Sequence, residues 1–244
     1  MKTQPSNNNQ NPKTEPMQKD AKGDAQEREL RRYQLHNQAS DLLEAGDNEG
    51  CLKCIQELRR GDPQEPWIDH IKGFLLSESG NQAQAIPLLR RAAKLLPDRL
   101  EPKITLGIAL MKDGKEDEAE QLLEEALELE PNSFLAMTNL GCVLLTRVEK
   151  PCLERAEKLL RRADELMPED AAIWASLGHA LVLQGRQPEA QEALLKAIRV
   201  DTTGQQCCWI AQLYPEFAAK AQFKLTELEM SWREKSSRRP GSKN

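Results

Sequence analysis

The stretch from Leu106 to Pro131, LGIALMKDGKEDEAEQLLEEALELEP, decides how the rest of the chain is read. Residues 100–112 carry apolar side chains at the three- and four-residue intervals of one helix face. Gly114 allows a tight turn, and residues 116–130 continue as a second amphipathic segment that Pro131 ends. The stretch therefore predicts two short helices joined as a hairpin.

The pattern occurs five times, in copies 34 residues apart, with three extra residues in the fourth copy. Each predicted first helix carries a small residue, and these are Ala39, Gly73, Gly107, Gly141 and Gly178. Each predicted second helix carries another, and these are Cys51, Ala85, Ala119, Ala156 and Ala190. Small residues let two helix backbones pass closely. One hairpin cannot bury its own apolar face, so neighbouring hairpins are expected to stack.

The repeats predict an all-α fold, a right-handed superhelical solenoid of helix-turn-helix units closed by a C-terminal capping helix. We expect a disordered N-terminal arm at residues 1–28, which are polar and have no apolar run. The five repeats occupy residues 29–203, at about 32–65, 66–99, 100–133, 134–170 and 171–204. Capping helices at 204–234 and a basic disordered tail at 235–244 complete the chain.

The repeat resembles the tetratricopeptide repeat family, whose 34-residue pattern is W-x2-L-G-x2-Y, then A-x3-F, then P. The stretches WASLGHAL at 174–181 and AQEALLKA at 190–197 carry the resemblance, which covers about residues 32–202. The leading aromatic residue survives only as Trp174. The resemblance implies that a concave face, built from the first helices, binds extended or helical peptides. The lysine and asparagine with which some members clamp the acidic tail of heat-shock chaperones are absent from the matching slots.

Spacings of three, four and three residues on the first helices mark the side chains expected to line the groove. The predicted groove residues are Trp67, His70, Phe74, Ile104, Ile108, Met111, Leu135, Thr138, Cys142 and Leu145. The same stripe in the fifth copy holds Ala172, Ala175, His179 and Val182. An apolar groove that stacking does not require usually marks a contact site. Its occupant is either another protein or a C-terminal helix, from this chain or from a second subunit.

No arrangement of residues indicates catalysis. Cys51 and Cys54 form a C-x-x-C, which elsewhere serves redox chemistry or zinc, but Cys51 fills the small-residue slot of its repeat and is expected to pack. The three histidines fall in different repeats without a catalytic relay, and no phosphate-binding glycine loop occurs. We therefore expect no enzyme activity, no cofactor and no bound metal.

A net charge of -5 with both signs intermixed gives no reason to expect nucleic acid or an anionic membrane as partner. The chain lacks the roughly 18 consecutive apolar residues of a membrane helix, and it has no export signal, so a cytoplasmic protein with reduced thiols is expected. Equivalent slots of successive second helices alternate in sign, which predicts a charge ladder on the convex surface. These slots hold Arg90 and Arg91, then Glu124 and Glu125, then Arg161 and Arg162.

These observations predict a non-catalytic adaptor, assembly factor or chaperone that binds an apolar or amphipathic segment of another protein in the groove. The alternative is a self-associating structural protein in which the groove receives its own or another subunit's C-terminal helix. Under this alternative, the protein can form a homo-oligomer.

Overall fold

The computed structural model describes residues 21–44, 47–61 and 66–237, and helices make up all regular secondary structure in these ranges. The predicted all-α fold is confirmed. The chain divides into two compact units, residues 1–63 and residues 64–244. Each unit is described by itself.

The first unit contains one helical hairpin, α1 (Ala21–Glu44) packed against α2 (Asn48–Gly61). Its buried side chains include Leu35 and Ala39 on α1 and Cys51, Ile55 and Leu58 on α2. Residues 21–28, expected to be part of a disordered arm, belong to α1 instead. They have no large apolar residues but include Ala, Gln, Glu and Arg, which favour helix formation. The rest of the predicted arm, residues 1–20, lies outside the described residues.

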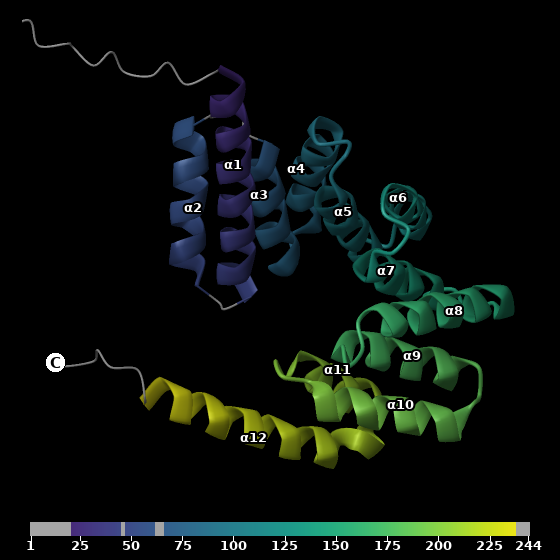
Figure 1. Ribbon diagram of the computed structural model, residues 1–244. Helices are drawn as coiled ribbons and strands as arrows, with labels where there is room; N and C mark the ends of the chain where they lie inside the picture. The colour runs from purple at the N-terminus through teal and green to yellow at the C-terminus, as the bar shows by residue number, and fades with distance from the viewer. Residues whose placement is uncertain (1–20, 45–46, 62–65, 238–244) are drawn as a thin grey trace, which may run out of the picture. The chain divides into compact units, whose positions relative to one another are not determined.

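The second unit is a series of helical hairpins in chain order (Figure 1). The first pairs are α3 (Pro66–Glu78) with α4 (Gln82–Leu95) and α5 (Leu100–Lys112) with α6 (Glu116–Leu129). The next are α7 (Phe134–Leu145) with α8 (Lys150–Leu166) and α9 (Ala171–Leu183) with α10 (Gln187–Val200). Each first helix also contacts the first helix of the next pair, from α3 through α5, α7 and α9 to α11 (Gln205–Leu213). This row of first helices positions the candidate site.

The small residues lie where the two helices of a hairpin approach most closely. A Cβ atom on Gly107 would lie 3.0 Å from Leu123 Cγ, and one on Gly178 would lie 2.7 Å from Leu194 Cγ. The turns use glycine for another reason, since Gly114 has a φ of 72°, which side-chain-bearing residues rarely adopt. Both roles follow from the repeat pattern.

The hydrophobic core runs through successive hairpins and is not gathered at one centre. Leucines from neighbouring helices share one buried cluster, including Leu89, Leu110, Leu123, Leu144, Leu160 and Leu181. Each hairpin therefore completes the core of the hairpins on either side, as expected of a solenoid.

The C-terminal end is built from α11, the short 3-10 helix η1 (Pro215–Phe217) and α12 (Ala218–Ser237). Cys207, Ile210, Phe217 and Ala221 form a buried cluster with residues of α10 that include Leu194, Ala197 and Ile198. Helix α12 continues to Ser237, three residues beyond the expected end of the capping helices, and residues 238–244 lie outside the described part of the chain. The C-terminal helices thus cover the apolar face of the fourth hairpin of this unit.

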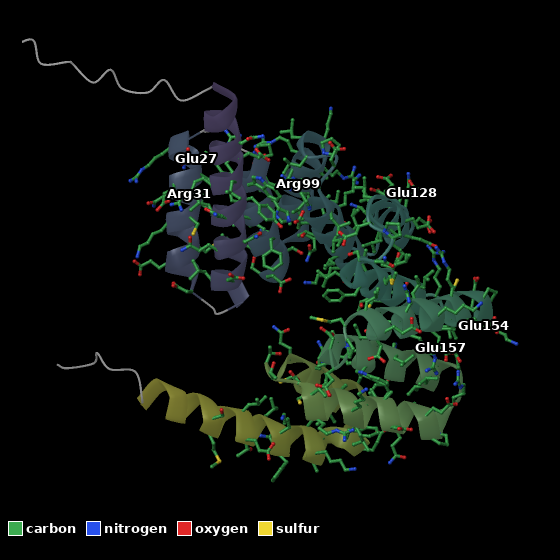
Figure 2. The ribbon with its side chains drawn as sticks, viewed as in Figure 1. Glu27, Arg31, Arg99, Glu128, Glu154 and Glu157 are labelled. Carbon is green, nitrogen blue, oxygen red and sulfur yellow. The ribbon has the colours of Figure 1, made fainter. Side chains whose placement is uncertain are left out.

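Ion pairs connect the outer surfaces of neighbouring hairpins. Glu157 on α8, labelled in Figure 2, accepts hydrogen bonds from Arg186 at 2.8 and 2.9 Å. Arg155 of α8 likewise donates to Glu120 of α6 at 2.7 Å. A charge ladder therefore exists, but its rungs differ from the expected slots. Among the described residues, Arg90 pairs with Glu118, Arg91 with Asp69, and Arg161 with Glu157.

Candidate binding site

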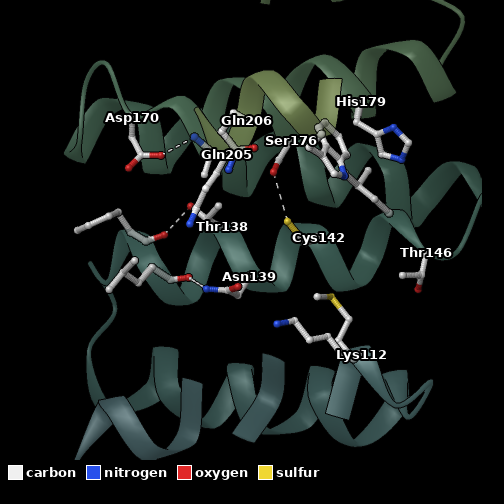
Figure 3. A pocket seen from close by; sticks show the side chains of 16 residues that line it. Lys112, Thr138, Asn139, Cys142, Thr146, Asp170, Ser176, His179, Gln205 and Gln206 are labelled. Carbon is white, nitrogen blue, oxygen red and sulfur yellow. Dashed lines mark hydrogen bonds between the residues drawn. The ribbon is translucent and has the colours of Figure 1, made fainter. Parts of the chain in front are cut away.

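A pocket of about 650 Å³ opens on the row of first helices in the second unit (Figure 3). Helices α5, α7, α9 and α11 all contribute to its lining. The lining residues are Met111, Lys112, Phe134, Leu135, Thr138, Asn139, Cys142, Leu145, Thr146, Asp170, Ala172, Ser176, His179, Gln205, Gln206 and Trp209. A volume of this size falls within the roughly 300–1,000 Å³ of small-ligand pockets.

Helical spacing explains how each helix presents a row of side chains to the pocket. On α7, Leu135, Thr138, Cys142 and Leu145 follow one another at intervals of three, four and three residues. Residues at these intervals share one helix face. The other face of α7 carries Leu140 and the remaining core residues, so burying that face turns the first toward the pocket.

The structure brings five of the predicted groove residues together at this pocket, namely Met111, Leu135, Thr138, Cys142 and Leu145. The other five, Trp67, His70, Phe74, Ile104 and Ile108, are not among its lining residues. His70 serves the packing of α3 against α5, and Trp67 packs against His70 on its own helix. His70 Nε2 lies 2.9 Å from Thr105 Oγ1, and the ring of Trp67, which is 1% exposed, meets the His70 ring edge to face.

Ile104 is buried in the core, and Ile108 packs against that core. Phe74 on α3 is half-buried. The spacing rule assigned these positions to the groove because it treats every first helix alike. In the contact between α3 and α5, however, His70 pairs with Thr105, and Ile104 is buried in the core.

Sequence reasoning missed the wall that α11 supplies through Gln205, Gln206 and Trp209. This helix lies beyond the last recognisable repeat, and its only sequence signal was the apolar pattern of a capping helix. Phe134, Asn139 and Ser176 were also missed, because each lies one residue beside the predicted stripe or between its members. From the stripe of the fifth copy, Ala172 and His179 do line the pocket.

The two charged side chains that line the pocket both have partners. Lys112 Nζ lies 2.7 Å from Glu78 Oε1. Asp170 caps α9, and its Oδ1 accepts hydrogen bonds from the backbone N–H groups of Ala172 at 2.9 Å and Ile173 at 3.0 Å. The pocket therefore offers apolar surface and neutral polar groups, with no uncompensated charge.

The aromatic wall of the pocket is held by a hydrogen bond between His179 Nδ1 and the Tyr214 hydroxyl. The Trp209 ring meets the His179 ring edge to face at 5.7 Å and the Tyr214 ring at 6.3 Å. Burial lowers the pKa of His179, so its imidazole is neutral at pH 7. Burial likewise raises the pKa of Tyr214 to about 12, so its hydroxyl keeps its proton. Both groups act as neutral hydrogen-bonding partners.

The thiol of Cys142 in the pocket lies 3.3 Å from the Ser176 hydroxyl. Burial raises the pKa of Cys142, which favours the thiol over the nucleophilic thiolate. Burial also raises the pKa of Cys51 and of Cys54 in the first unit, where both side chains are buried. Their environment favours packing, as we expected, over redox or metal chemistry.

Within the described ranges, no group of three or more His, Cys, Asp or Glu side chains is arranged to hold a metal ion. The described helices also include none long and apolar enough to cross a membrane. The arrangement of the pocket suits recognition by shape and hydrogen bonding.

Helical hairpins stacked through a continuous core define the class of the protein, an α-solenoid. Two models of the tetratricopeptide repeat match the chain, at residues 76–140 and 153–204. The chain thus contains tetratricopeptide repeats. Repeats of this type are protein–protein interaction modules and are generally non-catalytic scaffolds.

Two curated proteins match short parts of the chain. Interferon-induced protein with tetratricopeptide repeats 3 from Mus musculus is 29% identical over 93 residues, which is 37% of this chain and 23% of that protein. Protein IFIT1 homolog B from Homo sapiens is 28% identical over 82 residues, which is 30% of this chain and 17% of that protein. The chain thus spans less than a quarter of either relative.

Two solved structures share the fold. A thermophilic tetratricopeptide repeat protein from Thermus thermophilus is 16% identical, with a TM-score of 0.60 over 80% of this chain and 99% of that chain. The crystal structure of MamA is 21% identical, with a TM-score of 0.51 over 66% of this chain and 93% of that chain. At these identities the likeness concerns the fold alone.

Proposed function

We propose that this protein is a non-catalytic adaptor, assembly factor or chaperone that binds a segment of another protein in the pocket between α5, α7, α9 and α11. The observation that carries the proposal is the pocket of about 650 Å³ on the row of first helices, with an apolar floor and no free charge. Leu135 is the clearest anchor, because 50% of it is exposed at the pocket wall.

The anchors differ from those expected of an evenly lined groove. Binding energy in protein interfaces is concentrated in a few well-packed apolar and aromatic residues. Here such residues are Leu135, Met111, Phe134 and Trp209, which come from three different helices. A partner side chain that enters the pocket can therefore touch several helices at once, which favours a defined binding position.

The α12 side chains that the structure describes do not line the pocket, and α12 packs instead against α10, α11 and η1. The pocket wall from α11 belongs to the site itself. This leaves the pocket open to a partner.

Matched substitutions test the proposal. Leu135 lines the pocket, whereas Leu129 at the end of α6 is similarly exposed, at 46%, and lies outside it. Affinity capture from cell extract is carried out with the unaltered chain, Leu135→Asp and Leu129→Asp, followed by quantitative mass spectrometry. Because both side chains are half exposed, both variants are expected to fold, which circular dichroism checks.

We expect specific partners to be lost by at least tenfold from Leu135→Asp and retained by Leu129→Asp, since an unpaired carboxylate in an apolar contact is strongly unfavourable. Partners retained equally by all three chains would exclude the pocket as the binding site.

A self-associating structural protein is the second candidate, and one observation favours it. Phe223 and Met230 on α12 are 68% and 60% exposed, and they lie seven residues apart on one helix face. A second copy could bury this face. Light scattering over a concentration series distinguishes the candidates, because the second predicts a tight dimer that Phe223→Asp converts to monomer.

A further inference from the structure

We infer that the pocket binds an uncharged peptide segment in an extended conformation, whose main chain is hydrogen-bonded by the side-chain amides of Asn139, Gln205 and Gln206. This inference rests on the proposed function and specifies the chemistry of the ligand. It follows from the charge of the pocket and from the hydrogen bonds that its polar side chains already make.

The charged groups of the pocket already have partners, which disfavours several occupants. Lys112 is paired with Glu78, and Asp170 is committed to the first turn of α9. A charged ligand residue entering the pocket would lose water and compete with these existing partners, which disfavours it. The chain's own residues 1–20 and 238–244 are poor candidates on another ground, because they contain no apolar run to cover Leu135 and Met111.

The side-chain amide of Asn139 has its oxygen end available to a ligand. Its Nδ2 donates a hydrogen bond to the carbonyl oxygen of Leu135, 2.8 Å away. This bond directs the amide nitrogen toward the backbone of its own helix. Oδ1 is therefore the atom left to accept a hydrogen bond from a ligand in the pocket. A backbone N–H of a bound peptide is the donor that fits such an acceptor.

The amides of Gln205 and Gln206 have both ends available. Both residues line the pocket from the first turn of α11, and within the described part of the chain their side chains make no hydrogen bond. Each amide has two N–H donors and one carbonyl acceptor. One such amide can therefore donate to a backbone carbonyl and accept from a backbone N–H of the same ligand.

Figure 3 shows Asn139 on one helix and the Gln205–Gln206 pair on another, bordering the same pocket. A helical ligand has already paired its backbone groups internally, so it would leave these three amides without partners as it displaces their water. An extended ligand brings unpaired N–H and C=O groups along its length. The amides therefore favour extended over helical peptides.

The test begins with a random twelve-residue peptide library displayed on phage and selected on the immobilised full chain, with Leu135→Asp as the reference. We expect the enriched sequences to lack Asp, Glu, Lys and Arg at their centre, to carry one or two large apolar residues, and to accept proline, which helices exclude. The peptide with the strongest enrichment is then synthesised for fluorescence anisotropy.

Replacing single backbone amides of that peptide by esters removes one N–H at a time. We expect at least one ester to weaken binding to the unaltered chain by about five- to tenfold, the usual effect of one lost hydrogen bond. The same ester should have no effect on Asn139→Ala, Gln205→Ala or Gln206→Ala, whichever residue supplies the acceptor. Gln212→Ala is the matched control, because Gln212 is exposed on the same helix and does not line the pocket.

Each contrary result has a distinct meaning. Enriched peptides with charges and helical spacing, together with esters that change nothing, would overturn the extended mode while the proposed function stands. If no peptide is enriched on the unaltered chain relative to the Leu135→Asp variant, the proposed function is overturned as well. A dimer of the chain that the selected peptide dissociates would identify a second copy as the occupant and also overturn the inference.

Discussion

Gly178 shows what a single position contributes to this fold. It lies in the middle of α9, where replacing glycine by alanine ordinarily stabilises a helix by about 1 kcal/mol. A Cβ atom there would lie 2.7 Å from Leu194 Cγ and 3.2 Å from the Leu194 backbone nitrogen. The close approach of α9 and α10 therefore reverses the usual preference.

We predict that Gly178→Ala lowers the free energy of unfolding by about 1–3 kcal/mol, the usual cost of forcing an extra carbon into a packed core. Urea denaturation followed by circular dichroism measures the change. The double variant Gly178→Ala, Leu194→Ala is the control. Because Leu194→Ala removes the side chain that the new Cβ would strike, the double variant should lose less unfolding free energy than the sum of the losses of the two single variants. Strict additivity would show that the contact is not the cause.

Asp201 fixes the position of a whole element, the helix α11. Its buried carboxylate accepts hydrogen bonds from the backbone N–H groups of Thr203 at 2.9 Å, Gly204 at 2.8 Å and Cys207 at 2.8 Å. Burial by itself would raise the pKa of Asp201, but the N–H groups of Cys207, Gly204 and Thr203 hold the pKa below its ordinary value. The carboxylate thus joins the end of α10 to the start of α11.

We predict that Asp201→Asn lowers the free energy of unfolding at pH 7 by about 1–3 kcal/mol, because neutral hydrogen bonds replace charge-assisted ones. A carboxyl group whose pKa is lower in the folded state stabilises the fold above its unfolded pKa of about 4, and this contribution is lost as the pH falls through the folded value. The difference between the two proteins should therefore shrink below about pH 4. Denaturant titrations from pH 3 to pH 7 test this, and a difference that is constant with pH would contradict it.

For the whole molecule, stability is expected to be shared between neighbouring hairpins. The C-terminal helices bury Leu194, Ala197 and Ile198 of α10 through Cys207, Ile210 and Phe217. Removing residues 204–244 would expose this face and also remove the Trp209 wall of the pocket. Burying one large apolar side chain is worth roughly 1.5–3 kcal/mol, and several are involved.

We therefore predict that the chain ending at residue 203 loses more than about 3 kcal/mol of unfolding free energy and fails to bind the selected peptide. Thermal unfolding and fluorescence anisotropy measure the two effects. A chain that lacks only residues 238–244 is the control and should match the full chain in both. Unchanged stability of the shorter chain would mean that α11 and α12 are not part of the cooperative core.

The regular part of the fold could be predicted from the sequence, because it repeats. Gly107 and Ala119 represent slots that recur at fixed intervals; Gly107 lies where its hairpin is tightly packed, and Ala119 is fully buried. The same physical requirement therefore produces the same residue pattern in every repeat. The pocket residues of α7 could be predicted for the same reason. The helical structure of residues 21–28 could not be predicted, because a helix without an apolar face gives no periodic signal.

The wall from α11 could not be predicted from the repeat pattern, since Trp209 belongs to no repeat. His70 and Ile104 fit the pattern but lie in contacts between neighbouring helices. Spacing identifies the face of a helix that a residue occupies. It does not determine how closely the next helix covers that face, which depends on the volumes of side chains from both helices.

The pocket lies at the junction of the last repeats with α11, and this restricts how the chain can evolve. Duplication of a hairpin upstream of α5 would lengthen the protein and leave every lining residue in place. Duplication between α10 and α11 would carry Trp209 away from Cys142 and destroy the cavity. Descendants of this gene are therefore free to gain or lose units on one side of the site only.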